Sequence, residues 1–382
     1  MSIYLDYNAS APINSRVLDI MIDAFKNHAG NADSRTHDFG DNARSLIEQS
    51  REKIAALLGV KRDEVFFTSG ATESNNIAIL GLKEYGLKNK RKHIITSSIE
   101  HKAVLEAAKH LEKDGFEVEF VDPDISGRIS VDEVASKIRP DTLLVSIMHV
   151  NNETGIIQPV AELGEYLSNT NTLFHIDATQ SCGKLVEEIR ELKYNMMSVS
   201  AHKMHGPQGI GALILRKKRY RLPPVAPIMY GGPQEHGIRP GTLPTALIAG
   251  FGKACEIASD EYIENTQKCL IIKNKLLKLL KDSGITYKLN GEPQWCVPTT
   301  INVSFIGVSS EALMLATKQY CGVSNGSACT SSNYSHSHVL TAMSLPDERI
   351  ESAIRVSWAA EVDADSLVSE FSKVLSVVKK LT

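Results

Sequence analysis

Short apolar runs alternate with amphipathic segments between residues 64 and 215. The apolar runs have the length of buried strands, and they lie at residues 64–68, 94–97, 117–121, 143–148, 173–176, 196–199 and 210–215. Apolar residues recur at helical spacing in the segments between them, at residues 71–82, 102–113, 131–138 and 160–168. This alternation predicts an α/β fold with a mostly parallel sheet covered on both faces, in which the strand at 210–215 could be antiparallel.

The flanking segments predict a second, smaller unit. Near the start, helices are expected at residues 15–28 and 43–58, the first with Val17, Ile20, Met21 and Phe25 on one face. After a loop at 217–245, the remaining elements are expected at 246–281 (helix), 300–305 (strand), 311–320 (helix), 349–358 (apolar segment) and 364–381 (helix). A chain of 382 residues exceeds the ~250–300 at which single cores usually split. We therefore predict a large domain at 14–255 and a small α/β domain made of 1–13 and 256–382.

Composition narrows the class of protein. A formal net charge of −3 gives no general attraction to nucleic acid or membrane, and no apolar run approaches the ~18 residues of a membrane helix. The start shows no basic region followed by an apolar core, so no secretory signal is expected. Six cysteines without a C-x-x-C pair argue against a disulfide framework and a zinc site. A cytoplasmic protein with free thiols is the simplest interpretation.

Two charged residues follow adjacent predicted strands in the segment 174–211. Asp177 comes directly after the first strand, and Lys203 comes shortly after the second. Ligands of open α/β sheets bind at the carboxyl ends of the strands. A lysine that forms a Schiff base and an aspartate that keeps a pyridinium nitrogen protonated are typical of a pyridoxal 5'-phosphate (PLP) site. A solvated surface pair is the alternative, but His202 beside the lysine and the glycines after it favour the site.

Other strand-to-helix turns carry polar residues that belong to the same predicted edge. The turn at 68–74 is rich in small residues, and the free N–H groups of Ala71 and Thr72 at a helix start can bind a phosphate. His101 in the next turn could stack on a pyridine ring and move protons, and Asn152 could bond the cofactor or the substrate. Each alone is compatible with an ordinary turn or cap.

Cys329 and Arg355 are the candidates of the second unit. Cys329 lies among Ser, Asn and Gly residues with almost no apolar neighbours, which favours an exposed nucleophilic thiol over a structural one. An incidental surface thiol is the alternative. Arg355 lies in an apolar strand, where a buried cation needs a partner: a substrate carboxylate or an internal salt bridge. His336 and His338 are expected to face solvent in a loop.

The motifs together resemble one family. The chain resembles the cysteine desulfurases that serve iron–sulfur assembly, among the fold-type I PLP enzymes, over nearly its full length. The motifs that carry the resemblance are YLDYNASAP, FTSGATESNN, ITSSIEHKAV, SIMHVNNETG, HIDATQSCGK, SVSAHKMHGPQGIGAL, RPGTLP and SNGSACTSS.

The resemblance implies a role for each matching residue. Lys203 would be the Schiff-base lysine, and Cys329 would form a persulfide. His101 would stack on the cofactor ring, Asp177 would pair with its nitrogen and Gln180 with its phenolic oxygen. The phosphate would be held by Ala71, Thr72, Ser200, His202 and, from the partner subunit of a homodimer, Thr242. Asn152 and Arg355 would hold the substrate, L-cysteine.

Some positions depart from the family pattern, so the surroundings of Lys203 are expected to differ from those of a typical member. Ala201 replaces a common glycine, Met204-His205 replaces an apolar-aromatic pair, and Asn325 replaces a common serine. None removes a catalytic group. A selenocysteine lyase, an aminotransferase of the same fold and a catalytically dead scaffold are the rival interpretations, and the combination of Lys203 with Cys329 disfavours the last two.

The acceptor of the sulfur is left open by the sequence. Most relatives supply iron–sulfur assembly or tRNA thiolation. However, parts of the chain resemble desulfurases of bacterial DNA phosphorothioation systems. These parts are segments 126–130 and 139–143, the stretch that follows them, and the Arg239-Pro240-Gly241 loop. The basic runs are short, so no direct nucleic-acid binding is expected. The prediction is a separate sulfur-acceptor protein that modifies DNA, with the housekeeping role as the alternative.

Overall fold

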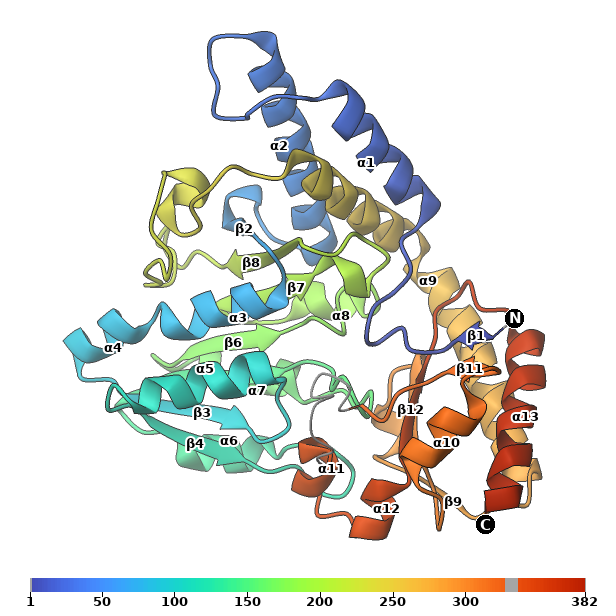
Figure 1. The fold of residues 1–382 in the computed structure, drawn as a ribbon. Helices are drawn as coiled ribbons and strands as arrows, with labels where there is room; N and C mark the ends of the chain where they lie inside the picture. The colour runs from blue at the N-terminus through green and yellow to red at the C-terminus, as the bar shows by residue number, and fades with distance from the viewer. Residues whose placement is uncertain (1, 327–335, 382) are drawn as a thin grey trace.

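A computed structural model describes residues 2–326 and 336–381, and its centre is a seven-stranded sheet (Figure 1). The strand order is β2-β8-β7-β6-β5-β3-β4. The strands are β2 (Val65–Thr68), β3 (His93–Ser97), β4 (Glu117–Val121), β5 (Thr142–Met148), β6 (Leu173–Asp177), β7 (Met196–Ser200) and β8 (Gly211–Leu215). Neighbouring strands from β4 to β7 are parallel, whereas β8 pairs antiparallel with both β2 and β7. The predicted α/β class and mostly parallel sheet are confirmed.

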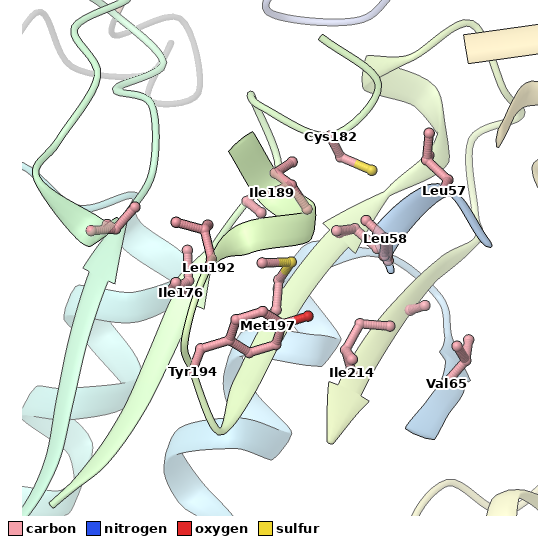
Figure 2. Packing of buried hydrophobic residues seen from close by; sticks show 14 of the residues in the cluster. Leu57, Leu58, Val65, Ile176, Cys182, Ile189, Leu192, Tyr194, Met197 and Ile214 are labelled. Atoms are coloured by element: carbon pink, nitrogen blue, oxygen red, sulfur yellow. The ribbon is translucent and has the colours of Figure 1, made fainter. Parts of the chain in front are cut away.

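Helices cover both faces of this sheet because its strands are apolar on both sides. The helices of this part are α1 (Ser15–Asn27), α2 (Asp38–Leu58), α3 (Ala71–Leu80), α4 (Lys83–Asn89), α5 (Lys102–Glu112), α6 (Val131–Lys137), α7 (Val160–Ser168) and α8 (Val186–Glu191). On one face Met196 packs with residues of α3 and α5. On the other, Met197 and Ile214 pack with Leu58 of α2 and Ile189 of α8, as Figure 2 shows. Successive residues of a strand thus serve opposite cores.

A second apolar core surrounds a smaller antiparallel sheet of order β12-β10-β9. Its strands are β9 (Tyr287–Leu289), β10 (Thr300–Phe305) and β12 (Ala353–Ser357), with β1 (Ile3–Tyr4) paired to β11 (Cys321–Gly322) nearby. Its helices are α10 (Ser310–Thr317), α11 (His338–Ala342), α12 (Asp347–Glu351) and α13 (Ala364–Leu381). The long helix α9 (Thr245–Asp282) joins the two cores: Phe251 belongs to the first and Leu276 to the second. The domain limits given above remain a prediction.

Several local expectations differ from the structure. Helix α2 begins at Asp38 instead of residue 43, because the His37 side chain accepts a hydrogen bond from the Gly40 N–H and caps the helix. Phe25 was predicted to share one face of α1 with Val17 and Met21, but it is 67% exposed, and Ala24 is buried together with these two residues. The short elements α4, β9, α11 and α12 were not predicted. Across residues 2–326 and 336–381, no helix combines the length and apolarity needed to cross a membrane.

Candidate active site

A cavity of about 280 Å³ lies at the carboxyl ends of β5 and β6, between the two cores. Eight of the predicted side chains line it: Ala71, Thr72, His101, Asn152, Asp177, Gln180, Lys203 and Arg355. Ser200, His202 and Thr242 do not line it, and Cys329 falls outside the described residues. Residues distant in sequence therefore meet here because each follows a strand of one sheet or projects from the second core.

Lys203 and Asp177 reach the cavity from neighbouring strands. Lys203 ends a single 3-10 turn (Ala201–Lys203) that follows β7, and its Nζ donates to the carbonyls of Asn8 (2.6 Å) and Ala9 (2.7 Å). Asp177 ends β6 and is buried, and its two oxygens accept from Asn75 Nδ2 (2.8 Å) and from the Thr179 N–H (3.0 Å) and hydroxyl (2.5 Å). These donors fix the orientation of the carboxyl group at the end of the strand.

His101 begins α5 and is fixed by the helix start. Its Nδ1 accepts the N–H of Ala103 (3.1 Å), so the ring proton of the neutral imidazole is on Nε2. Burial lowers the pKa of His101, opposed by the nearby Asp177 carboxylate. A neutral ring is suited to stacking on an aromatic cofactor.

The turn before α3 is shaped for a phosphate. Gly70 has φ +151° and precedes α3, which begins at Ala71 without a side-chain cap. A Cβ on Gly211 would lie 2.7 Å from Gly70 Cα, and a Cβ on Gly70 would lie 3.7 Å from Ser200 Oγ. The bare backbone of this turn thus meets Ser200 and leaves the first N–H groups of α3 open to an anion. Burial lowers the pKa of the nearby His202 to about 4.

Arg355 has an internal partner and also a donor that faces the cavity. Its Nη2 forms a salt bridge with Asp6 (2.6 Å) and its Nη1 donates to the Asn152 carbonyl (2.9 Å), so an internal pair exists. Its Nε is buried without a partner, although the side chain lines the cavity. An unsatisfied buried donor favours a ligand acceptor at this position.

Sequence reasoning missed several residues that hold the site. Asn8 donates to the Asn152 carbonyl (3.2 Å) and Thr300 Oγ1 (3.0 Å) while its own carbonyl accepts from Lys203. His175, beneath Asp177 on β6, lies between the hydroxyls of Ser146 (2.8 Å) and Ser198 (3.0 Å), and burial lowers its pKa to about 4. These contacts join elements that are far apart in the chain, so no local sequence motif predicts them.

The prediction that two histidines near the end of the chain face solvent in a loop is right for His336 and wrong for His338. Both line the cavity, and His338 Nε2 donates to the Glu100 carbonyl at 2.9 Å. Since a carbonyl only accepts, Nε2 of His338 carries the proton. His338 is half-buried, whereas His336 is exposed and lies 3.4 Å from a Glu351 oxygen. His338 therefore packs at the site instead of facing solvent.

The described residues fit PLP. An amine, a hydrogen-bonded carboxyl group, a neutral imidazole and an anion-binding helix start surround one cavity, and these are the groups that a pyridine ring with an aldehyde and a phosphate requires. The groups contributed by the large sheet and its turns are therefore sufficient to bind the ring and the phosphate of PLP. Thr242 is exposed and outside the cavity.

Comparison with known proteins gives consistent matches over the whole chain. A family model described as Aminotransferase class-V matches residues 3–367. The cysteine desulfurase IscS of Vibrio cholerae serotype O1 (strain M66-2) is 44% identical over 372 residues, covering 95% of this chain and 90% of the relative. Among solved structures, a NifS-like protein has 35% identity and a TM-score of 0.91 with full coverage of both chains. DndA from Streptomyces lividans has 43% identity and a TM-score of 0.81, covering 92% of this chain and 98% of the other.

Proposed function

The chain belongs to the class-V aminotransferase family and is a cysteine desulfurase, and from this premise we propose that Cys329 takes the sulfur of L-cysteine as a persulfide and passes it to an acceptor protein. The observation that carries the proposal is the convergence of eight predicted side chains on one cavity around Lys203. The enzymes of this family depend on PLP. When bound, PLP supplies an electron sink for the substrate's α-carbon.

Each cavity residue has a place around the cofactor. Lys203 Nζ, which donates to the Asn8 and Ala9 carbonyls, would hold the cofactor covalently and would act as the base for the substrate α-proton. Asp177 would pair with the pyridine nitrogen, Gln180 would donate to the phenolic oxygen, and His101 would stack on the ring. Ala71 and Thr72, with Ser200 and His202 nearby, would hold the phosphate.

Arg355 and Asn152 hold the substrate. The donors of Arg355 that remain for the carboxylate of L-cysteine are the buried Nε, which has no partner, and the second N–H of each terminal nitrogen, since each of these has one partner. The salt bridge to Asp6 fixes the guanidinium plane in that position. The internal salt bridge and the substrate contact are therefore parts of one arrangement.

The nucleophile is assigned to Cys329 partly by the state of the other thiols. Each of the other cysteines is free, and burial raises its thiol pKa: to about 12 for Cys182, Cys269 and Cys321, and above the ordinary value for Cys255 and Cys296. A thiol with such a pKa is almost entirely protonated at neutral pH and is a poor nucleophile. Gly326 and His336, on either side of the segment that contains Cys329, both line the cavity.

The transfer balances without an added oxidant. The Cys329 thiolate forms a bond to the sulfur of the substrate, and the bond between that sulfur and the β-carbon breaks with its electron pair left on carbon. Protonation of that carbon, together with the return of a proton to the α-carbon, gives L-alanine, and the enzyme retains a persulfide. The acceptor protein then removes the terminal sulfur through attack by its own thiolate.

A Cys329→Ser variant tests this assignment. The holoenzyme variant should keep its PLP absorbance and bind L-cysteine, yet release almost no alanine and show no persulfide by intact-protein mass spectrometry. Cys321→Ser is the matched control and should retain normal turnover. Substantial alanine release by the Cys329 variant, with loss in the Cys321 variant, would move the nucleophile to Cys321.

We further propose that the enzyme is a cytoplasmic homodimer whose sulfur serves DNA phosphorothioation through a separate acceptor. The similarity to DndA and the resemblance of segments 126–130 and 139–143 support this destination, whereas the similarity to IscS supports a housekeeping role. Deleting the gene in its host and digesting genomic DNA for mass spectrometry separates the two. Loss of phosphorothioate dinucleotides supports the first role; failing iron–sulfur enzymes with unchanged DNA support the second.

A further inference from the structure

A second cavity, of about 80 Å³, lies against Lys203 and is lined by a lysine that the proposed function does not use. This is Lys184, which shares the cavity with Tyr7, Cys269 and Trp358. Lys184 ends the turn that follows β6 and stands four residues after Gln180. It therefore lies between this cavity and the residues of the candidate active site.

The contacts of Lys184 lead directly to the active site. Its Nζ donates to Gln180 Oε1 (3.3 Å), and Gln180 Nε2 donates to the Asn8 carbonyl (2.9 Å), which also accepts from Lys203. In the part of the chain that the structure describes, Gln180 is the hydrogen-bond partner of Lys184, and no carboxylate pairs with it. Burial, with the nearby charge of Lys203, lowers the pKa of Lys184 to about 8. Burying a charged amine in this position costs free energy unless its hydrogen bonds offset the lost hydration.

These contacts fix the orientation of the Gln180 amide. An ammonium can only donate and a backbone carbonyl can only accept. The reversed amide would place its NH₂ against the ammonium of Lys184 and its oxygen against the Asn8 carbonyl, so both contacts would become repulsive. Gln180 is buried and lines the active-site cavity. One of its two N–H bonds serves Asn8, and the second remains for a ligand.

We propose that Lys184 is a positioning residue that holds the Gln180 amide with an N–H, and not its oxygen, toward the phenolic oxygen of PLP. The inference rests on the proposed placement of Gln180 beside that oxygen. The phenolic oxygen is electron-rich and requires a donor, so a reversed amide would repel it. Lys184 thereby contributes to cofactor binding without touching the cofactor.

The backbone directs Lys184 to this position. Gly183 has φ +78°, and a Cβ there would lie 3.1 Å from the Cβ of Met204, the residue after Lys203. Cys182 Sγ also contacts Met204 Sδ at 3.6 Å. The turn is thus packed against the segment that carries Lys203, and the lysine side chain has a defined direction.

The test compares Lys184→Met with Lys184→Arg in the PLP-loaded enzyme. Methionine keeps the apolar stem but has neither donor nor charge, so it should shift the visible absorption band of bound PLP and weaken PLP affinity about tenfold, as expected for one lost charge-assisted hydrogen bond. Arginine can still donate to Gln180 and should restore most of both. Lys273→Met is the matched control, because Lys273 is a buried lysine that donates to the carbonyls of Cys296 and Val297, away from the candidate active site. It should lower the unfolding temperature without changing the spectrum.

A double variant shows whether Lys184 acts through Gln180. In a Gln180→Leu background, Lys184→Met should cause no further change in the spectrum or in PLP affinity. A Lys184→Met enzyme with the wild-type spectrum and affinity, but a lower unfolding temperature, would mean that Lys184 only packs and would overturn the inference alone. If the wild-type protein neither acquires the PLP band nor releases alanine from cysteine, the proposed function fails and takes the inference with it.

Discussion

At the scale of single residues, a substitution of Arg355 shows whether this side chain binds the substrate or only stabilises the fold. Arg355→Ala removes the donor proposed for the substrate carboxylate, which is a charge-assisted hydrogen bond of roughly 1.5–3 kcal/mol. We expect the KM for L-cysteine to rise about 10- to 150-fold with PLP binding nearly unchanged. Asp6→Asn is the control, since its amide oxygen can still accept from Nη2 and hold the guanidinium plane while the charge is removed, so KM should change much less than in Arg355→Ala. Equal effects of both variants on stability, with KM unchanged, would leave Arg355 a purely structural residue.

Glu100 provides a pH-dependent prediction at the same scale. It is fully buried beside the site, and burial, with the Asp177 charge adding, raises its pKa to about 8. Its Oε1 accepts from Ser97 Oγ (2.6 Å) and the Met148 N–H (2.9 Å), whereas Oε2 has no partner. Between pH ~4.5 and 8 the unfolded chain has released this proton and the folded protein keeps it. The free energy of unfolding therefore falls with rising pH, by up to about 1.4 kcal/mol per pH unit.

Glu100→Gln should remove this dependence. The amide oxygen can accept both existing hydrogen bonds, and a neutral group has no proton to lose. In urea unfolding, the variant should be more stable than the wild type at pH 8 by a few kcal/mol, and the difference should shrink toward pH 5. A difference that stays constant across this range would contradict the assigned state of Glu100.

The individual elements show which parts of the molecule are visible in the sequence. The sheet was predictable because its central strands, such as β6 and β7, are short and mostly apolar, and Asp177 and Lys203 because they lie at or just after the ends of these strands. Asn8 and His175 were not, because their partners come from other elements, such as Thr300 on β10 and Ser198 on β7. The early start of α2 depends on a histidine cap, which is an uncommon helix signal. Local patterns thus give elements and strand ends, but not the contacts between distant segments.

The close approach of β8 to the turn before α3 leads to an element-scale prediction. A Cβ on Gly211 would lie 2.5 Å from the Val199 carbonyl oxygen and 2.7 Å from Gly70 Cα, and backbone atoms cannot move away cheaply. Gly211→Ala should therefore lower stability by about 1–3 kcal/mol and weaken PLP binding, as it displaces the phosphate turn. Gly322→Ala is the control, because the nearest atom to its Cβ would be Tyr4 Cδ2 at 3.6 Å, an ordinary van der Waals contact. Wild-type PLP affinity in Gly211→Ala would show that the turn does not hold the phosphate.

At the scale of the whole molecule, one predicted phosphate-binding residue does not reach the cavity of its own chain. Thr242, which the family resemblance assigns to the phosphate of the neighbouring subunit, is exposed and outside the cavity of its own subunit. Helix α1 also presents an exposed apolar stripe of Leu18 (42%), Ile22 (41%) and Phe25 (67%) at the periphery of the fold (Figure 1). A contiguous apolar stripe on a helix is typical of an interface between subunits. Both features support a homodimer in which each subunit completes the other's phosphate site.

Phe25→Asp tests this surface. A carboxylate in an apolar interface must be desolvated, so the variant should shift from dimer to monomer in sedimentation at micromolar concentration and lose PLP affinity as the Thr242 contact is lost. Leu315→Asp on α10 is the matched control, because Leu315 is similarly exposed (63%) but lies over the second core. It should remain dimeric and fully active. A wild-type protein that sediments as a monomer and turns over cysteine normally would show that the site is complete in one chain, and the assignment of Thr242 would be wrong.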